Sequence, residues 1–243
     1  MIISFFEEFP TKENLNKTKL IDFPTKLYLA THSLKEFNKI KKSIKNKYIK
    51  EFIYWPILER KEGYWISPFT RRTALKRIFN ELNDSRISVM LDLELPTRQN
   101  PLLYLTQIFN FLANKALIKR FIKTHKGKIY AAEYFPEGKA KLLTLKTLGI
   151  HYQNTKVIKM FYSSLHNFNT DFLKEEFKIA QNRNYLVALG TISPGIHGNE
   201  PNVELKTLKR DLLLAKQTKI EEAIIFRLGG LNNNYKKIIK KII

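Results

Sequence analysis

The sequence predicts an α/β protein that folds as a single (β/α)8 barrel, also called a TIM barrel. Short apolar, β-branched runs recur along all 243 residues, and segments with helical spacing of apolar residues separate them. The interval from one run to the next is roughly 25 to 35 residues, the size of one strand–helix unit. Eight such units in a chain of this length are typical of a closed barrel.

Eight runs have the composition of strands that are buried on both faces, as in a parallel sheet covered by helices. They are Ile2–Phe6, Lys26–Ala30, Glu51–Tyr54, Ile87–Leu93, Lys128–Ala132, Val157–Phe161, Tyr185–Leu189 and Glu222–Phe226. An open, doubly wound sheet is the alternative, and it normally has a glycine-rich turn after its first strand. The turn here, residues 6–11, has no glycine, which favours the barrel. No linker interrupts the chain, so we expect one domain over residues 1–243.

Helical periodicity lies between the expected strands. Apolar residues recur at helical intervals in three segments, Leu34–Ile44, Ala74–Leu82 and Leu205–Leu212. Thr11 stands where an N-cap of the first helix belongs. Ser33 precedes Glu36 at the spacing of a capping box. Both signals come just after an expected strand, as the loops of a barrel require.

The composition describes a basic chain that can build a core. Lys and Arg number 43 against 22 Asp and Glu, which gives a formal net charge of +21, and 44% of the residues are hydrophobic. A positive field favours anionic partners such as nucleic acid, anionic lipid or phosphorylated substrates. Most of the excess is lysine spread over expected helices, and no nucleic-acid-binding motif accompanies it. Nucleic acid is therefore a partner that the charge allows and that no motif supports.

The absence of Cys excludes a disulfide framework, a thiol nucleophile and a Cys-ligated zinc site. The first residues lack the basic head and long apolar run of a secretory signal, and no apolar stretch could span a bilayer. We therefore expect a cytoplasmic protein without a transmembrane segment. The basic tail, Tyr235–Ile243, predicts a last helix that packs its isoleucines on the fold. A position on a membrane surface is the alternative for this tail.

Carboxylates gather where three expected strands end, which is where a barrel of this kind carries its function. They are Glu7 and Glu8, Asp92 and Glu94, and Glu133. Buried carboxylates are costly unless they are paired, protonated or metal-bound, so the cluster indicates chemistry. The structural alternative is that some of these acids point outward, toward helix N-termini. That alternative fits Glu8 better than Asp92 or Glu94.

Side chains alternate along a strand, so Asp92 and Glu94 would point into the barrel together, roughly 7 Å apart. Glu133 on the next strand would lie roughly 5 Å to one side if the two registers match. Like-charged neighbours raise the pKa of one carboxyl and leave an acid beside an ionised partner. Glycoside hydrolysis uses such a pair, one group as proton donor and the other as an anion that supports the oxocarbenium-like state.

The segment Asp92-Leu93-Glu94-Leu95-Pro96 resembles the end of the fourth-strand motif of chitinase-like glycoside hydrolases of family 18, Asp-x-Glu-x-Pro. Met160-Phe161-Tyr162 resembles their sixth-strand Met-x-Tyr, which an Asp follows. The resemblance implies that Glu94 is the acid/base, that Asp92 orients the acetamido group that supplies the nucleophile, and that Tyr162 contacts the substrate. Acids of the family pattern are replaced in this sequence by Ile87, Met90 and Ser163.

The loop after the third expected strand is rich in aromatic residues. Both tryptophans of the chain, Trp55 and Trp65, lie here with Tyr64 and Phe69. Aromatic faces stack on sugar rings, which would suit a carbohydrate site. The alternative is that these rings form a private core of the loop.

A second hypothesis uses the same strand ends for phosphate chemistry. Carboxylate oxygens would hold Mg²⁺ or Ca²⁺, supplied by Glu7, Asp92, Glu94 and Glu133. His32 would then act as acid or base. Arg227 would bind a phosphate beside the glycine-containing loops that follow the last two strands.

We therefore predict a carbohydrate-active hydrolase that needs no cofactor. Glu94 would be the general acid, and Asp92 and Glu133 would be supporting carboxylates. Substrate contacts would come from Tyr162, Trp55, Glu7, His32 and Arg227. A phosphodiesterase or phosphosugar enzyme that depends on a divalent cation is the first alternative. A non-catalytic barrel that binds an anionic partner is the second.

Overall fold

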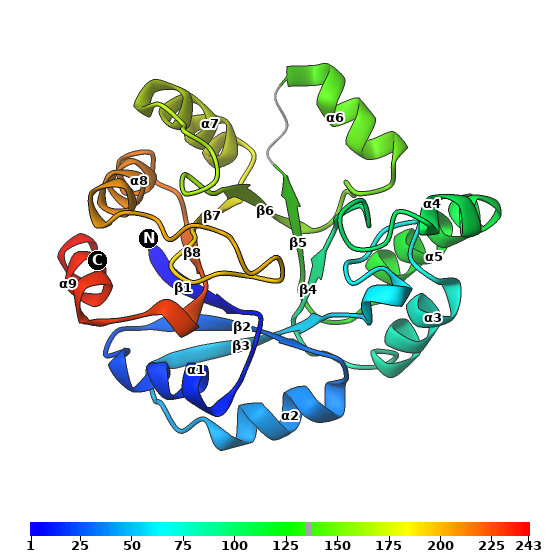
Figure 1. The fold of residues 1–243 in the computed structure, drawn as a ribbon, viewed down its shortest axis with the longest axis horizontal. Coiled ribbons are helices and arrows are strands. Elements are labelled where there is room, and N and C mark those ends of the chain that lie inside the picture. Colours follow the sequence, from blue (N-terminus) through cyan, green and yellow to red (C-terminus); the bar gives the residue numbers. More distant parts are fainter. Residues whose placement is uncertain (135–137) are drawn as a thin grey trace. The chain divides into compact units, whose positions relative to one another are not determined.

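A computed structural model describes residues 1–134 and 138–243. In these residues eight strands are hydrogen-bonded in chain order and close into a barrel. Figure 1 follows the alternation of strands and helices from the blue N-terminus to the red C-terminus. The prediction of a (β/α)8 barrel is confirmed.

Every strand overlaps the apolar run that predicted it. The strands are β1 (Ile2–Glu7), β2 (Thr25–Thr31), β3 (Ile49–Pro56), β4 (Val89–Asp92), β5 (Ile129–Tyr134), β6 (Lys156–Phe161), β7 (Leu186–Gly190) and β8 (Glu222–Phe226). The shortest of them, β4, ends at Asp92. Glu94 therefore belongs to the loop that follows β4 and not to the strand.

A helix follows each strand. The α-helices are α1 (Lys12–Asn16), α2 (Leu34–Ser43), α3 (Arg72–Glu81), α4 (Leu103–Thr106), α5 (Phe111–Thr124), α6 (Gly138–Thr147), α7 (Thr170–Asn182), α8 (Leu205–Gln217) and α9 (Asn233–Ile242). Short 3-10 helices are η1 (Lys17–Leu20), η2 (Arg60–Glu62), η3 (Ile108–Asn110) and η4 (Leu228–Gly230). Thr11 caps α1, as predicted, by accepting from the Asn14 N–H. The Ser33 hydroxyl accepts from the Glu36 N–H, but the Glu36 carboxylate accepts from the His32 N–H, one residue before the predicted capping-box donor.

Two compact units make up the chain. Unit 1 consists of Met1–Ala30, Asn38–Ile53 and Ile158–Ile243, and unit 2 consists of Thr31–Phe37 and Tyr54–Val157. The strand order of the barrel runs through both units. One domain over residues 1–243 stays a prediction.

In unit 1, the strand register decides which side chains face the barrel interior. Phe6 pairs with Tyr28 of β2 and with Phe226 of β8. Its ring contacts both of theirs, at centroid distances of 5.2 and 6.3 Å. On the opposite face of the sheet, Phe161 packs against Phe177 of α7 at 5.3 Å. Even-numbered residues of β1 thus face the interior, and odd-numbered residues face the helices.

A polar cluster is buried on the interior face near the start of these strands. The Lys26 Nζ lies 2.6 Å from the Glu222 carboxylate, and the Tyr28 hydroxyl donates to the same carboxylate at 2.9 Å. Glu222 is fully buried. A charge in this position needs such partners, because an uncompensated buried charge strongly destabilises a fold.

The C-terminal helix α9 packs as the sequence predicts. Tyr235, Ile239 and Ile242 are buried. Lys236 and Lys240 both lie 3.0 Å from the Asp22 carboxylate, and these lysines lower the pKa of Asp22. Within the described part of the chain, no helix combines the length and the apolar character needed to cross a bilayer.

Lys26→Met should lower the free energy of unfolding by about 3 kcal/mol, because it removes the cation beside a buried carboxylate. Lys26→Met combined with Glu222→Leu should recover most of this loss, since the buried charge is then gone as well. The control is Lys41→Met on the exposed surface of α2, which should change the value by less than about 0.5 kcal/mol. Urea denaturation measures all three. If Lys26→Met and Lys41→Met lowered the free energy of unfolding equally, a stabilising role for the Lys26–Glu222 pair would be contradicted.

Candidate active site

The structure divides the predicted site residues between the two units. In unit 1, Glu7 ends β1, Tyr162 follows β6 and Arg227 follows β8. In unit 2, the predicted residues lie at or just after the ends of β2, β3, β4 and β5, and they are His32, Trp55, Asp92, Glu94 and Glu133. All of them occupy the strand ends at which the sequence placed them.

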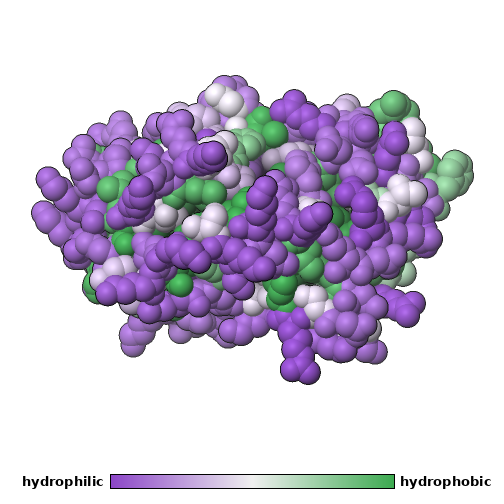
Figure 2. All heavy atoms as spheres, turned by 90° about the horizontal axis from the view of Figure 1, so that it is seen from below, coloured by the Kyte–Doolittle hydropathy of each residue, from purple (hydrophilic) through white to green (hydrophobic). Residues whose placement is uncertain are grey.

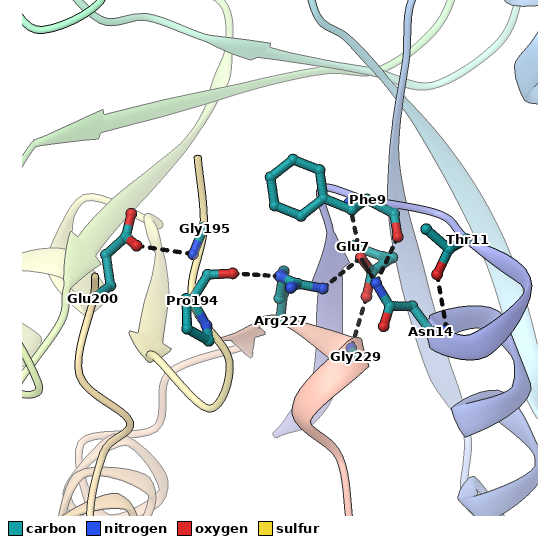
Figure 3. A network of polar contacts seen from close by, with 9 residues as sticks. All are labelled: Glu7, Phe9, Thr11, Asn14, Pro194, Gly195, Glu200, Arg227 and Gly229. Atoms are coloured by element: carbon teal, nitrogen blue, oxygen red, sulfur yellow. Dashed lines mark hydrogen bonds and ion pairs between the residues drawn. The ribbon is translucent and has the colours of Figure 1, made fainter. Parts of the chain in front are cut away.

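Glu7 is a fully buried carboxylate that accepts four hydrogen bonds (Figure 3). Its Oε1 accepts from the Phe9 N–H at 2.8 Å, from Asn14 Nδ2 at 3.3 Å and from Arg227 Nη1 at 3.0 Å. Its Oε2 accepts from the Gly229 N–H at 2.7 Å. Because Asn14 belongs to α1, Glu7 points toward the helices and joins β1, α1 and the loop after β8.

Arg227 extends this network to a third loop. Its Nε donates to the Pro194 carbonyl oxygen at 2.8 Å, and its guanidinium carbon lies 4.8 Å from the centre of the Phe9 ring (Figure 3). Charge-assisted hydrogen bonds of this kind are strong and directional. Arg227 is 8% exposed. Its contacts hold the loops that follow β1, β7 and β8 together, so any phosphate would compete with three protein contacts.

The contacts of Glu7 indicate a structural role, which is to hold β1, α1 and the loop after β8 together; this role is called the clamp. Burial raises the pKa of the Glu7 carboxyl, and the Arg227 guanidinium with two backbone N–H groups opposes that rise. Four donors already use the carboxylate oxygens. Across residues 1–134 and 138–243, no group of three or more Asp, Glu or His side chains could hold a metal ion.

Glu8 takes the interior position, the reverse of the prediction for this pair of acids. It lies directly after β1, and it is 3% exposed. A Cβ at Gly195 would lie 2.9 Å from both the Glu8 carboxylate and the Phe226 ring, so the loop after β7 packs closely on them. The Tyr162 ring lies 5.7 Å from the same Phe226 ring. The direction of Glu8 was predicted wrongly, because alternation shows which residues share a face and does not show which face is the interior.

Asp92 and Glu94 are buried carboxylates, 5% and 8% exposed. Val89 of β4 pairs with Tyr54 of β3, and the Tyr54 ring packs against Phe37 of α2 at 5.3 Å. Odd-numbered residues of β4 therefore face the helices, and Asp92 faces the barrel interior, as the alternation predicts.

Glu133 does not share a face with Asp92. Asp92 pairs with Ala132, so alternation directs Glu133 to the opposite side of the sheet. There its Oε2 lies 2.9 Å from Nδ1 of His151, and both side chains are buried. The expected contact with Asp92 required matching registers, and an offset of one residue removes it. His151 was missed because it lies in the loop before β6 with no motif around it.

The aromatic residues of β3 and of the loop after it are buried, and Trp55 faces the barrel interior because its neighbour Tyr54 faces the helices. Trp55 and Trp65 are 3% and 7% exposed. Tyr64 packs edge-on against Trp65 at 5.6 Å. With so little exposed surface, the tryptophans offer no open face for stacking. His32, by contrast, is exposed at the end of β2.

Asp211 on α8 is a fully buried carboxylate that sequence analysis missed, because it lies among ordinary helical residues. It accepts from Arg210 Nε at 2.8 Å. Arg210 Nη2 donates in turn to the Ser163 hydroxyl at 3.4 Å, which links α8 to the end of β6. Burial raises the pKa of Asp211, and its contacts with Ser163 and Arg210 oppose only part of that rise.

No family model matches the sequence, and no curated protein is significantly similar to it. Among solved structures, the chain is similar to the catalytic domain of β-amylase from Paenibacillus polymyxa. The TM-score is 0.52 at 8% identity, over 100% of this chain and 97% of that one. The shared feature is the fold. The chain is also similar to a GH5-4 broad-specificity endoglucanase from Clostridium longisporum, with a TM-score of 0.49 at 10% identity, over 96% of this chain and 85% of that one.

Glu7→Gln should lower the free energy of unfolding by about 2 kcal/mol, because one amide oxygen must serve four donors while the amide N–H groups face Arg227. Glu13→Gln is the matched control, since Glu13 is exposed on α1. It should change the value by less than about 0.5 kcal/mol. Guanidinium denaturation measures both, and similar values for the two variants would rule out the clamp.

Asp211→Asn should stabilise the protein near pH 7 and leave it unchanged near pH 3. A raised pKa in the folded state means that protonated Asp211 is favourable. Its stabilisation is therefore lost as the pH rises through the folded pKa. Asparagine stays neutral at every pH, so the Tm of Asp211→Asn should exceed that of the unmodified protein by a margin that increases with pH. Asp171→Asn, at an exposed position of α7, should show no such trend, and a gap that opens toward acid would refute the assignment.

Proposed function

We propose that the protein is a glycoside hydrolase whose acid chemistry is carried by Glu94 and Asp92. The observation behind this proposal is that two carboxylates, two residues apart, are buried at the C-terminal end of β4. Barrels of this type carry their catalytic groups at the C-terminal ends of the strands. The fold shared with a β-amylase catalytic domain supports the same class of chemistry.

Glu94 is assigned the role of general acid and Asp92 that of its ionised partner. Two neighbouring buried carboxylates are costly to ionise together, so one holds a proton while the other stays charged. The protonated group delivers its proton to the leaving oxygen of the glycosidic bond. The ionised group supports the positive charge that develops on the sugar ring.

The remaining residues are assigned to positioning or to substrate contact. Glu133 is a positioning residue, because it binds His151 on the other face of β5, the strand beside β4. Glu7 and Arg227 hold the loops of unit 1. Tyr162 is the proposed substrate contact in that unit, next to the Phe226 ring.

The end of β4 supports a narrower proposal about the substrate. Its Asp-x-Glu-x-Pro pattern resembles family 18, in which the Asp orients an acetamido group of the substrate. We propose the same task for Asp92, which would make the substrate an N-acetylated oligosaccharide. Ile87, Met90 and Ser163 stand where that family has acids, so Asp92 would act with fewer carboxylate neighbours than it has there.

Glu94→Gln should lower the rate of hydrolysis about a thousandfold, because general acid catalysis is lost while the shape of the side chain is kept. The assay is the release of reducing ends from chitin oligosaccharides, with α- and β-glucans in parallel. Asp92→Asn should slow hydrolysis of the N-acetylated substrates in particular.

Glu175→Gln is the matched control, since Glu175 is exposed on α7, and it should keep full activity. Circular dichroism confirms that the variants are folded. Unchanged turnover in Glu94→Gln, or no hydrolysis of any of these sugars by the unmodified protein, would overturn the proposal. Activity on glucans alone would overturn its narrower part, the acetamido group.

A further inference from the structure

Five large apolar side chains are exposed on one short stretch of unit 2. They are Leu102 (60% exposed), Leu105 (73%), Ile108 (55%), Phe109 (97%) and Leu112 (75%), and together they are called the apolar ridge. Single exposed apolar residues are ordinary on a protein surface, but a contiguous group marks an interaction site.

The ridge stands on a well-packed base. It runs from Leu102, just before α4, over α4 and η3 to Leu112 in the first turn of α5, so its members lie close together along the chain. Other residues of the same segment pack inward. Leu103 is buried, and Phe111 packs against Phe69 at 4.9 Å. Buried Asn114 donates to the carbonyl oxygens of Pro68 and Thr70, both at 2.9 Å. The exposure of the ridge is therefore a property of folded helices.

The chain around the ridge is basic and contains no acid. Residues 95–132 include no Asp or Glu but seven Lys and Arg, namely Arg98, Lys115, Lys119, Arg120, Lys123, Lys126 and Lys128. Lys126 is paired with Asp84, and Lys115 donates to two carbonyl oxygens at the end of α6. The other five are exposed.

The last residue of the ridge, Leu112, and two exposed lysines lie on the same face of α5. Leu112, Ala116, Lys119 and Lys123 follow the spacing of one helix face, and all four are exposed. Lys119 and Lys123 are called the basic row. The apolar ridge thus ends at Leu112, and the basic row continues from there along the same face of α5. Figure 2 shows hydrophobic side chains among hydrophilic ones at the right-hand edge, the side on which Figure 1 draws α4 and α5.

We propose that the apolar ridge and the basic row bind the surface of an anionic phospholipid bilayer. The ridge would enter the boundary between headgroups and acyl chains, and the basic row would stay at the level of the negative headgroups. This proposal does not depend on the proposed hydrolase activity.

Charge favours this occupant over the others. A second copy of the chain would bring two molecules of formal charge +21 together, with the same basic row on each side. Nucleic acid would use the cations but would leave the ridge in water. The tail helix α9, the segment that sequence analysis singled out for a membrane, buries its apolar face and is not available.

Sedimentation with vesicles tests the proposal. The full chain is mixed with phosphatidylcholine vesicles that contain about 30% phosphatidylglycerol, and with vesicles of phosphatidylcholine alone. Binding to the anionic vesicles is expected to be at least about tenfold stronger, and to weaken as salt is raised from about 0.1 to 0.5 M. Leu105→Ser with Phe109→Ser, and separately Lys119→Glu with Lys123→Glu, should each reduce binding about tenfold or more.

Matched controls carry the same chemical changes on other exposed helix faces. Ile179→Ser with Leu213→Ser controls for the ridge, and Lys174→Glu with Lys178→Glu controls for the basic row at equal net charge. Both controls should bind like the unmodified protein, and circular dichroism verifies folding.

Three results would overturn the proposal. The first is no binding to the anionic vesicles. The second is equal loss of binding in the ridge and control variants. The third is self-association in the absence of vesicles, measured by light scattering and abolished by the ridge variant, which would assign the ridge to a second copy.

Discussion

The alternation of side chains along parallel, closed strands is the constraint on which the candidate site depends. A residue at a strand end faces either the barrel interior or the helices, and a shift of one residue exchanges the two. The contact of Phe6 with Tyr28 and Phe226 fixes this parity for β1. It sends Glu7 into the helix layer and Glu8 to the interior. Asp92 and Glu133 are separated by the same rule, although they lie on neighbouring strands.

Buried carboxylates take different roles according to their partners. Asp211 lies beside its chain neighbour Arg210, so this pair joins no distant segments. Glu7 pairs with Arg227 and Glu222 pairs with Lys26, and each of these two pairs ties together segments that are distant in sequence. Such pairs are structural, since both oxygens serve the fold. Asp92 and Glu94 form a different kind of group, because the chain brings two buried acids to the end of one strand.

The sequence was sufficient for the positions of the strands and for the expectation that carboxylates collect at their ends, because apolar runs and strand ends are local properties. It was insufficient for contacts between side chains on neighbouring strands, because these depend on the register of strand pairing. Glu133 meets His151 because β4 and β5 pair with an offset of one residue. Asp211 is buried because α8 presents that face inward, and a lone acid in a helix gives no local sign of this. Trp55 and Trp65 could be read as sugar-stacking residues or as core residues, and their low exposure favours the core.

The distribution of charge carries more information than its sum. A net charge of +21 is compatible with many partners, and a lysine-rich composition explains it without any. Some of these lysines have a structural task, as Lys236 and Lys240 do at Asp22. Residues 95–132 differ because they combine a complete lack of acids with five exposed apolar side chains on the same elements. A diffuse positive field would steer the molecule toward any polyanion, whereas cations that continue an apolar ridge along one helix face match a negative surface with an apolar interior.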